Sequence, residues 1–296
     1  MKSDKRILIA FLLNLVFSVI EFFGGFLTKS VAVISDSIHD LGDAISIGIS
    51  YILEKISKKK PDNKYTYGYL RYSILGAMIT NTILIVGSLF VIINAINRII
   101  NPIVINYNGM IILAIIGFII NLFASIVTKE GESLNQKAVN LHMLEDVLGW
   151  LIVLIGAFVI KVTKFYIIDS ILSILVGLFI LYNALKSYKE VLDLFLEKIP
   201  NNIDIDEIKS HILKIHDVIN IHHVHIWSID GSNNYATMHI ITDSKNINKL
   251  KNDIKEELKE HGISHTTIEI EDPNYECEEI DCKIKTKKIH NHHHHH

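Results

Sequence analysis

Long apolar stretches occupy most of the first 195 residues of this 296-residue chain. A helix needs about 20 predominantly apolar residues to cross the hydrocarbon core of a bilayer. Six stretches reach that length, at residues 7–28, 31–54, 72–97, 109–128, 139–160 and 165–189. Only helices and closed barrels satisfy their backbone hydrogen bonds inside lipid, so these stretches predict six transmembrane helices. No small-residue cleavage site follows the first stretch, and we expect it to be a retained span.

Lysine and arginine are concentrated in alternate loops. The 55–71 loop carries Lys55, Lys58, Lys59, Lys60, Lys64 and Arg71, and the N-terminus carries Lys2, Lys5 and Arg6. Basic residues favour the cytoplasmic side of a membrane. We therefore expect a multi-pass protein of the cell membrane with both termini in the cytoplasm. The basic loop also suits contact with the anionic lipids of the bilayer.

Two histidines occur in the first 200 residues, and each is followed four positions later by an aspartate. The pairs are His39–Asp43 and His142–Asp146, and residues four apart share one face of a helix. At the helical rise per residue, Asp43 lies roughly 18 Å from the cytoplasmic edge and Asp146 about 22 Å from the outer edge. Both depths are near the middle of a core about 30 Å thick. Two imidazoles and two carboxylates at one depth suit tetrahedral zinc, with cobalt or cadmium also possible.

A simpler explanation is that these histidines form hydrogen bonds between helices. One buried histidine would fit that role, but two matching pairs favour a metal site, because ionisable groups inside a bilayer are costly. Asp36 and Asp40 lie within about 60° of Asp43 around the helix. Either could be an outer partner that holds an imidazole in place, and Asp36 is alternatively a cap or ion-pair partner near the outer end.

Residues 200–283 are polar and mixed, which predicts a separate cytosolic α+β domain. The expected elements are a helix from Asp204 to about His216, strands over 222–229, 235–242 and 264–271, and a helix over 246–261. The order αββαβ predicts a small ferredoxin-like sandwich with both helices on one face of the sheet. The chain then divides into a transmembrane domain over 1–199, this domain over 200–283, and a tail over 284–296 that ends in a stretch typical of an affinity tag.

Histidine is frequent in the cytosolic domain. Clusters of His, Glu and Cys are the usual sign of a metal site, so the histidines of the predicted strands are candidate ligands. His211, His216 and His261 are expected to be ordinary surface residues. Cys277 and Cys282 form a Cys-x4-Cys pair, and without a secretory signal such a pair favours a reduced metal site over a disulfide.

The chain resembles the zinc-transporting branch of the cation diffusion facilitator family over about residues 7–273. The two His-x3-Asp motifs are the specific part, and the segments 67–71, 222–227 and 265–271 support them. The resemblance implies a six-span homodimer that exports zinc from the cytosol in exchange for protons by alternating access, and that dimerises through its cytosolic domain. The family's transport site corresponds to His39, Asp43, His142 and Asp146. Manganese-type members carry Asp-x3-Asp, so the two histidines argue against manganese.

The resemblance also implies a cytosolic metal site formed by His222, His239 and Glu271. Cys277 and Cys282 would complete it, and His265 is a weaker candidate. Some family members bind another metal through histidines in the 55–71 loop. Tyr65 and Tyr69 occupy those positions here and leave only Asp62 as a ligand, so we expect the loop site to be absent or weak.

Two other functional classes compete with transport. A membrane metalloenzyme, such as an intramembrane metalloprotease, needs an open metal position beside a general base, whereas four protein ligands fill a tetrahedron and the sequence has no His-Glu-x-x-His signature. A membrane sensor without transport would explain the cytosolic site, but ligands at the bilayer midplane favour a substrate path. The net charge of −3 is uninformative about nucleic acid, and the resemblance implies no nucleic-acid partner.

Overall fold

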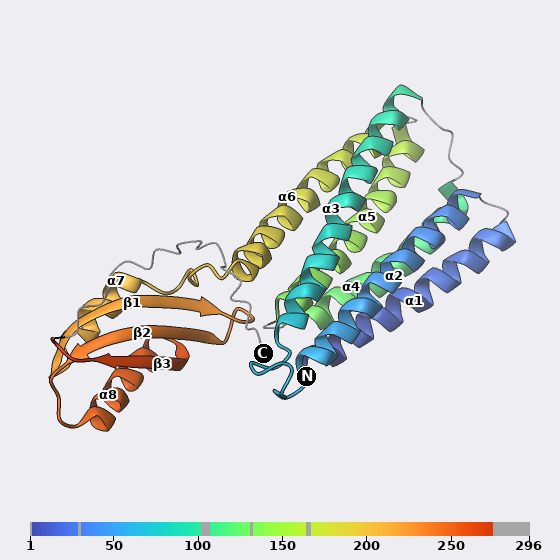
Figure 1. The fold of residues 1–296 in the computed structure, drawn as a ribbon. Helices are drawn as coiled ribbons and strands as arrows, with labels where there is room; N and C mark the ends of the chain where they lie inside the picture. Colours follow the sequence, from blue (N-terminus) through green and yellow to red (C-terminus); the bar gives the residue numbers. More distant parts are fainter. Residues whose placement is uncertain (1, 29–30, 102–106, 131–132, 164–166, 275–296) are drawn as a thin grey trace, which may run out of the picture. The chain divides into compact units, whose positions relative to one another are not determined.

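The computed structural model describes residues 2–28, 31–101, 107–130, 133–163 and 167–274. Two compact units make up the chain. One comprises the described residues up to Glu197 together with Ile229–Ser232, and the other comprises Lys198–Ser228 and the described residues from Asn233 onward. The first unit is built from long helices, and the second combines short helices with a sheet (Figure 1).

Six long helices lie alongside one another in the first unit (Figure 1). They are α1 (Ser3–Thr28), α2 (Val31–Ser57), α3 (Arg71–Ile100), α4 (Tyr107–Lys129), α5 (Leu134–Thr163) and α6 (Ile167–Phe195). Each coincides with one of the predicted apolar stretches, but α5 begins at Leu134 rather than at residue 139. The side-chain amide groups of this extra turn donate to neighbouring segments, since Asn135 bonds to the Ser50 carbonyl at 2.8 Å and Gln136 to the Thr128 carbonyl at 2.8 Å.

Apolar residues cover much of the outside of this bundle. Within the described residues, Ser3–Gly24, Arg71–Ile100 and Leu134–Gly156 are long and apolar enough to cross a membrane by length and composition. Val86, Phe90 and Ile112 are each more than 60% exposed, as expected of side chains that lipid rather than water solvates. Bilayer crossing by α2, α4 and α6 stays a prediction.

Helix α5 is central in the bundle, because it contacts each of the other five helices. Small side chains let membrane helices approach closely. One buried cluster joins α1, α2, α4 and α5 through Ile7, Ala10, Ile47, Ala124, Val139 and Met143. On α3, a Cβ at Gly76 would lie 2.6 Å from the Asn135 Oδ1 atom of α5, so a larger residue there would displace the Asn135 amide. Because α5 is central, one of its faces lies in the interior of the bundle.

The second unit contains a three-stranded sheet in the order β1 (Val218–Ser228), β2 (Asn234–Thr242) and β3 (Ile263–Glu271). β1 is antiparallel to β2, and β2 is parallel to β3. A parallel pair needs a crossover connection, which α8 (Ile247–Glu260) provides. Both α8 and α7 (Ile205–Ile212) pack on one face of the sheet, because they share an apolar core with the strands that includes Ile208, Ile212, Leu250, Ile254, Met238 and Ile268. The predicted αββαβ sandwich is confirmed.

The helix starts of this unit follow from their caps. The Asp204 carboxylate accepts from the backbone amides of Asp206 and Glu207 at 2.9 and 3.2 Å, which satisfies amide groups that a helix start leaves unpaired. Helix α7 ends at Ile212, short of the predicted His216. The chain there reverses into β1 through Asp217, whose φ is +72°, and β1 begins at Val218 rather than at His222.

Candidate metal sites

Asp43 on α2 and His142 and Asp146 on α5 meet inside the helix bundle. One ligand atom from each residue lies within 4.8 Å of the other two. His142 Nε2 is 3.7 Å from Asp43 Oδ1, and both side chains are more than 90% buried. The structure therefore brings together three of the four residues that the His-x3-Asp motifs predict.

The fourth residue, His39, is in α2, where the helix backbone places it one turn before Asp43. Its side chain and that of Asp36 lie outside the described residues. Asp40 is described and half-buried on the same helix. Ligand or outer-partner roles for these three residues stay predictions.

Two polar residues that sequence reasoning left without a role lie beside this group. Asn14 of α1 is 2% exposed and donates to Asp146 Oδ2 at 3.4 Å. A Glu145 oxygen lies 3.9 Å from His142 Nδ1, and Ser88 of α3 donates to the other Glu145 oxygen at 3.4 Å. Glu145 therefore lies beside the imidazole, at a separation longer than a hydrogen bond. Glu145 follows His142 by three residues, and this spacing alone predicts that the two side chains are neighbours on one helix face.

The spacing of the bundle group suits a small divalent ion after a modest contraction. Zinc–ligand bonds of about 2.0–2.1 Å place tetrahedral ligand atoms about 3.4 Å apart. The distance of 3.7 Å from His142 to Asp43 is close to that value, and the group as a whole spans up to 4.8 Å. The donor set of imidazole nitrogen and carboxylate oxygen fits zinc, cobalt or cadmium.

A second group lies on the sheet of the other unit and consists of His222 on β1, His239 on β2 and Glu271 on β3. The Glu271 carboxylate lies between the two imidazoles, 3.1 Å from His222 Nε2 and 2.7 Å from His239 Nδ1. Glu269 approaches His239 Nε2 at 3.3 Å. Two imidazoles and a carboxylate that converge in this way form a donor set suitable for zinc.

A β-bulge in β1 places His222 in this group. Strict alternation from Val224 and Ile226 would direct His222 toward the helices. Between the pairs His222–His239 and His225–Thr237, β1 instead has one residue more than β2, and His223 adopts a φ of +50°. The extra residue reverses the alternation, so Ile221 joins the apolar core and His222 lies on the opposite face with His239. Its ring is 5.2 Å from that of His239.

Burial affects the protonation of the sheet group. His222 is 8% exposed, and removal from water lowers the pKa of its imidazole, only partly opposed by the Glu271 carboxylate. A lower pKa keeps the imidazole neutral to more acidic pH, and the neutral form is the one that binds a metal. His222 is therefore ready to act as a ligand throughout the neutral range.

Other predicted ligands of the cytosolic unit are not in this group. His265 is exposed on β3, and its ring packs 5.1 Å from that of Tyr235, away from the three converging residues. Cys277 and Cys282 lie outside the described residues. His216 is exposed, as expected of a surface residue. His211 and His261 are partly exposed as well, and the packing of α7 against α8 brings both of them to Glu257.

Asp62 in the loop between α2 and α3 has a structural role. Its Oδ1 atom accepts from the backbone amides of Lys64 and Tyr65, each at 2.8 Å, and its Oδ2 atom accepts from the Tyr69 hydroxyl at 2.7 Å. These bonds lower the pKa of Asp62 and raise the pKa of Tyr69 to about 12. Both carboxylate oxygens thus stabilise the turn, and the expected weakness or absence of a metal site here stays a prediction.

Comparison with known proteins matches both units. Residues 7–196 match the family model described as "Cation efflux transmembrane domain", and residues 200–273 match "Cation efflux protein, cytoplasmic domain". A "Cadmium, cobalt and zinc/H(+)-K(+) antiporter" of Bacillus subtilis is 34% identical over 98% of this chain and 96% of the relative. A "Zinc transporter ZitB" of Yersinia pseudotuberculosis is 35% identical over 95% and 91%. A "Metal cation efflux system protein CzcD" of Cupriavidus metallidurans is 32% identical over 91% and 87%.

Proposed function

Because the chain belongs to the cation efflux family of membrane transporters, we propose that it exports zinc from the cytosol in exchange for protons, by alternating access. The observation that carries the proposal is the convergence of Asp43, His142 and Asp146 inside the bundle. Ionisable residues in such a position mark ion paths. The names of the relatives support zinc as the main substrate, with cadmium and cobalt as further ones.

In this proposal His39, Asp43, His142 and Asp146 hold the ion, and Asn14 and Glu145 orient the ligands on α5. Metal ligands have to be deprotonated, and histidine titrates near neutral pH. Arrival of zinc from the cytosol therefore releases protons, and its departure on the other side lets protons bind again. This competition couples the two fluxes without a separate proton site.

We further propose a homodimer in the cell membrane, joined through the cytosolic unit, with both termini in the cytoplasm. The basic residues of the 55–71 loop support this orientation. The match to the family's cytoplasmic domain supports the placement of the second unit. A cysteine-labelling reagent that does not cross membranes tests the orientation in intact cells, because Cys277 and Cys282 should react only after the membrane is permeabilised.

Transport by the purified chain in liposomes tests the function. With zinc outside and an acidic interior, we expect zinc uptake that stops when a protonophore collapses the pH gradient, because zinc and protons exchange at one site. A zinc-sensitive dye measures the uptake, and protein-free liposomes are the control. Zinc binding without uptake would favour a membrane sensor, and uptake that ignores the pH gradient would contradict proton exchange.

For the sheet group we propose a regulatory zinc site formed by His222, His239 and Glu271. An ion that binds one conformation better shifts the population toward it, so cytosolic zinc would control the transporter. In a chain that also carries His142→Ala, we expect His239→Ala to remove one zinc equivalent in isothermal titration. His265→Ala, on the exposed side of β3, is the matched control and should leave the stoichiometry unchanged. Equal loss in both variants would contradict the assignment.

A further inference from the structure

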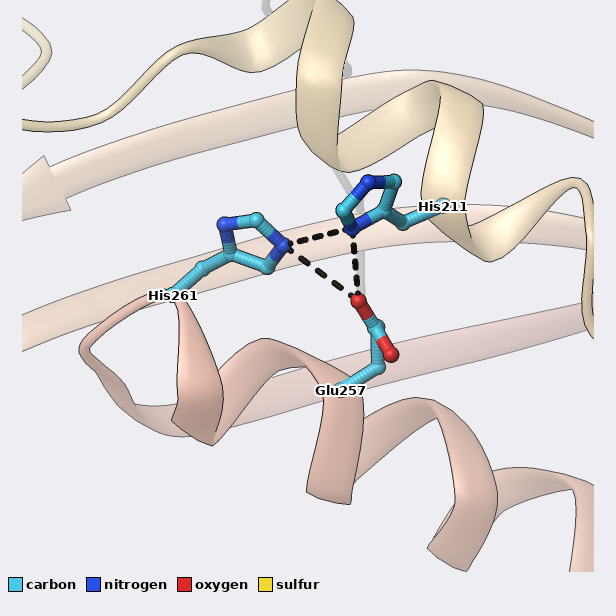
Figure 2. Close-up of side chains that lie close together, drawn as sticks. All are labelled: His211, Glu257 and His261. Atoms are coloured by element: carbon cyan, nitrogen blue, oxygen red, sulfur yellow. Dashed lines mark hydrogen bonds and ion pairs between the residues drawn. The ribbon is translucent and has the colours of Figure 1, made fainter.

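Three potential metal ligands meet between the two helices of the cytosolic unit (Figure 2). His211 lies near the end of α7, Glu257 lies in the last turn of α8, and His261 caps that helix. His211 Nδ1 is 2.9 Å from Glu257 Oε1 and 3.0 Å from His261 Nε2, and His261 Nε2 is 3.3 Å from the same Glu257 oxygen. The two ring nitrogens and the oxygen therefore form a nearly equilateral triangle.

We propose that His211, Glu257 and His261 form a zinc-type site distinct from the sheet group. The two groups are separated by the sheet and its core: α7 and α8 pack on the core face, whereas His222, His239 and Glu271 lie on the opposite face. No ligand is shared between them. The proposal is also independent of transport, since it concerns binding by the second unit.

The triangle fits one face of a coordination tetrahedron. With bonds of about 2.0–2.1 Å, zinc holds its ligand atoms about 3.4 Å apart, and the three observed separations of 2.9, 3.0 and 3.3 Å are slightly shorter. The side chains of His211, Glu257 and His261 are 37%, 27% and 18% exposed. Solvent can therefore occupy a fourth position, and the ion can exchange with the surrounding solution.

Hydrogen bonds alone do not satisfy the two ring nitrogens and the Glu257 oxygen at the same time. A neutral imidazole has one N–H group, so a proton on His211 Nδ1 serves either Glu257 or His261 at one time. If His261 Nε2 is protonated as well, two N–H groups face each other across 3.0 Å. A divalent cation accepts a lone pair from each of the three atoms, and so satisfies all of them together.

Metal binding here would join α7 to α8. Helix α7 has only 8 residues, and helices of that length are marginal without tertiary contacts. An ion that binds only the folded arrangement stabilises it. Since α7 is the first element of the unit after α6, occupancy would order the segment where the cytosolic unit begins.

Cobalt(II) binding by the full chain in detergent tests the site. All variants end at His290, because the five consecutive histidines that follow would bind the same ion. His142→Ala and His239→Ala form the background, so that the bundle and sheet groups contribute nothing. Equilibrium dialysis gives cobalt per chain, the visible spectrum reports tetrahedral coordination, and hydrogen exchange reports the protection of Ile205–Ile212.

In this background we expect one cobalt per chain, and slower exchange across α7 when cobalt is present. His211→Ala should lose both effects, and Glu257→Gln, which retains the side-chain shape and folding contacts, should weaken binding at least about tenfold, because it loses a charged ligand. His216→Ala, an exposed histidine next to α7, is the matched control and should retain both. The proposal is overturned if the background binds no cobalt, or if His211→Ala and His216→Ala bind equally.

Discussion

Replacing His142 by alanine is expected to reduce zinc flux into liposomes to the level of protein-free vesicles. His142 Nε2 faces Asp43 at 3.7 Å in the buried bundle group, so its loss removes a nitrogen ligand from the proposed transport site. Changing a residue that only orients a ligand typically costs about 10–100-fold in metal affinity, and loss of the ligand itself costs more. Fluorescent zinc and pH indicators inside the vesicles measure both fluxes, which should disappear together.

Two further variants make this result specific. Asn183→Ala removes a polar side chain of α6 that bonds to its own helix, at the Phe179 carbonyl, and should transport normally. Glu145→Gln leaves the proposed ligands in place but replaces the carboxyl group beside His142 Nδ1 with an amide. It should raise the zinc concentration needed for half-maximal flux and retain transport at saturating zinc. Normal flux in His142→Ala would refute the bundle group as the transport site.

Replacing Glu54 by alanine is expected to cause the largest loss of stability in the helix bundle. Glu54 is 3% exposed near the end of α2. Its Oε2 atom accepts from the hydroxyls of Ser73 on α3 and Ser133 beside α5, at 2.8 and 2.9 Å. The other oxygen lies 3.8 Å from Lys58 Nζ, and Lys58 also pairs with Asp4 of α1. One carboxylate thus connects the ends of four segments.

Without this carboxylate the buried hydroxyl of Ser73 and the partly buried hydroxyl of Ser133 lose their acceptor. Each unsatisfied buried group costs about 1–3 kcal/mol, and about 1 kcal/mol lowers the melting temperature by roughly 2–4 °C in a chain of this size class. We expect the melting temperature of Glu54→Ala in detergent to be about 5 °C lower. Tryptophan fluorescence recorded at one scan rate measures it. Glu54→Gln, which keeps one acceptor, should lose less.

Glu130→Ala is the matched control for Glu54. Glu130 is also an acidic residue in an ion pair, with Arg6 at 3.4 Å, but its side chain is 83% exposed. Exposed ion pairs contribute at most about 1 kcal/mol, so this variant should melt close to the unaltered chain. Equal melting of Glu54→Ala and Glu130→Ala would show that the buried network does not stabilise the bundle.

Local pattern was sufficient to predict the elements of both units. Apolar length predicted α1 to α6, and alternating hydrophobicity with turn residues predicted the order of α7, β1, β2, α8 and β3. Boundaries were less accurate where polar residues find partners in other helices. Asn135 at the start of α5 is the clearest case, because its partners come from α2.

The partners of each candidate ligand depended on tertiary packing. The His-x3-Asp spacing predicted which faces of α2 and α5 carry ligands, but the contact between Asn14 and Asp146 spans 132 positions and no periodicity predicts it. In β1, one extra residue reverses the alternation and brings His222 to His239. Register changes of that kind depend on strand pairing, which hydrophobic pattern alone does not define.

Sequence by itself determined the class of this protein: a bundle of apolar helices with paired His-x3-Asp motifs, followed by an αββαβ domain rich in histidine. Only the tertiary structure decided which histidines gather, since His211 and His261 are separated by 50 positions and meet at Glu257 because α7 packs beside α8. The physical reason is that periodicity records which face of an element is buried. A ligand group depends instead on where faces of different elements meet.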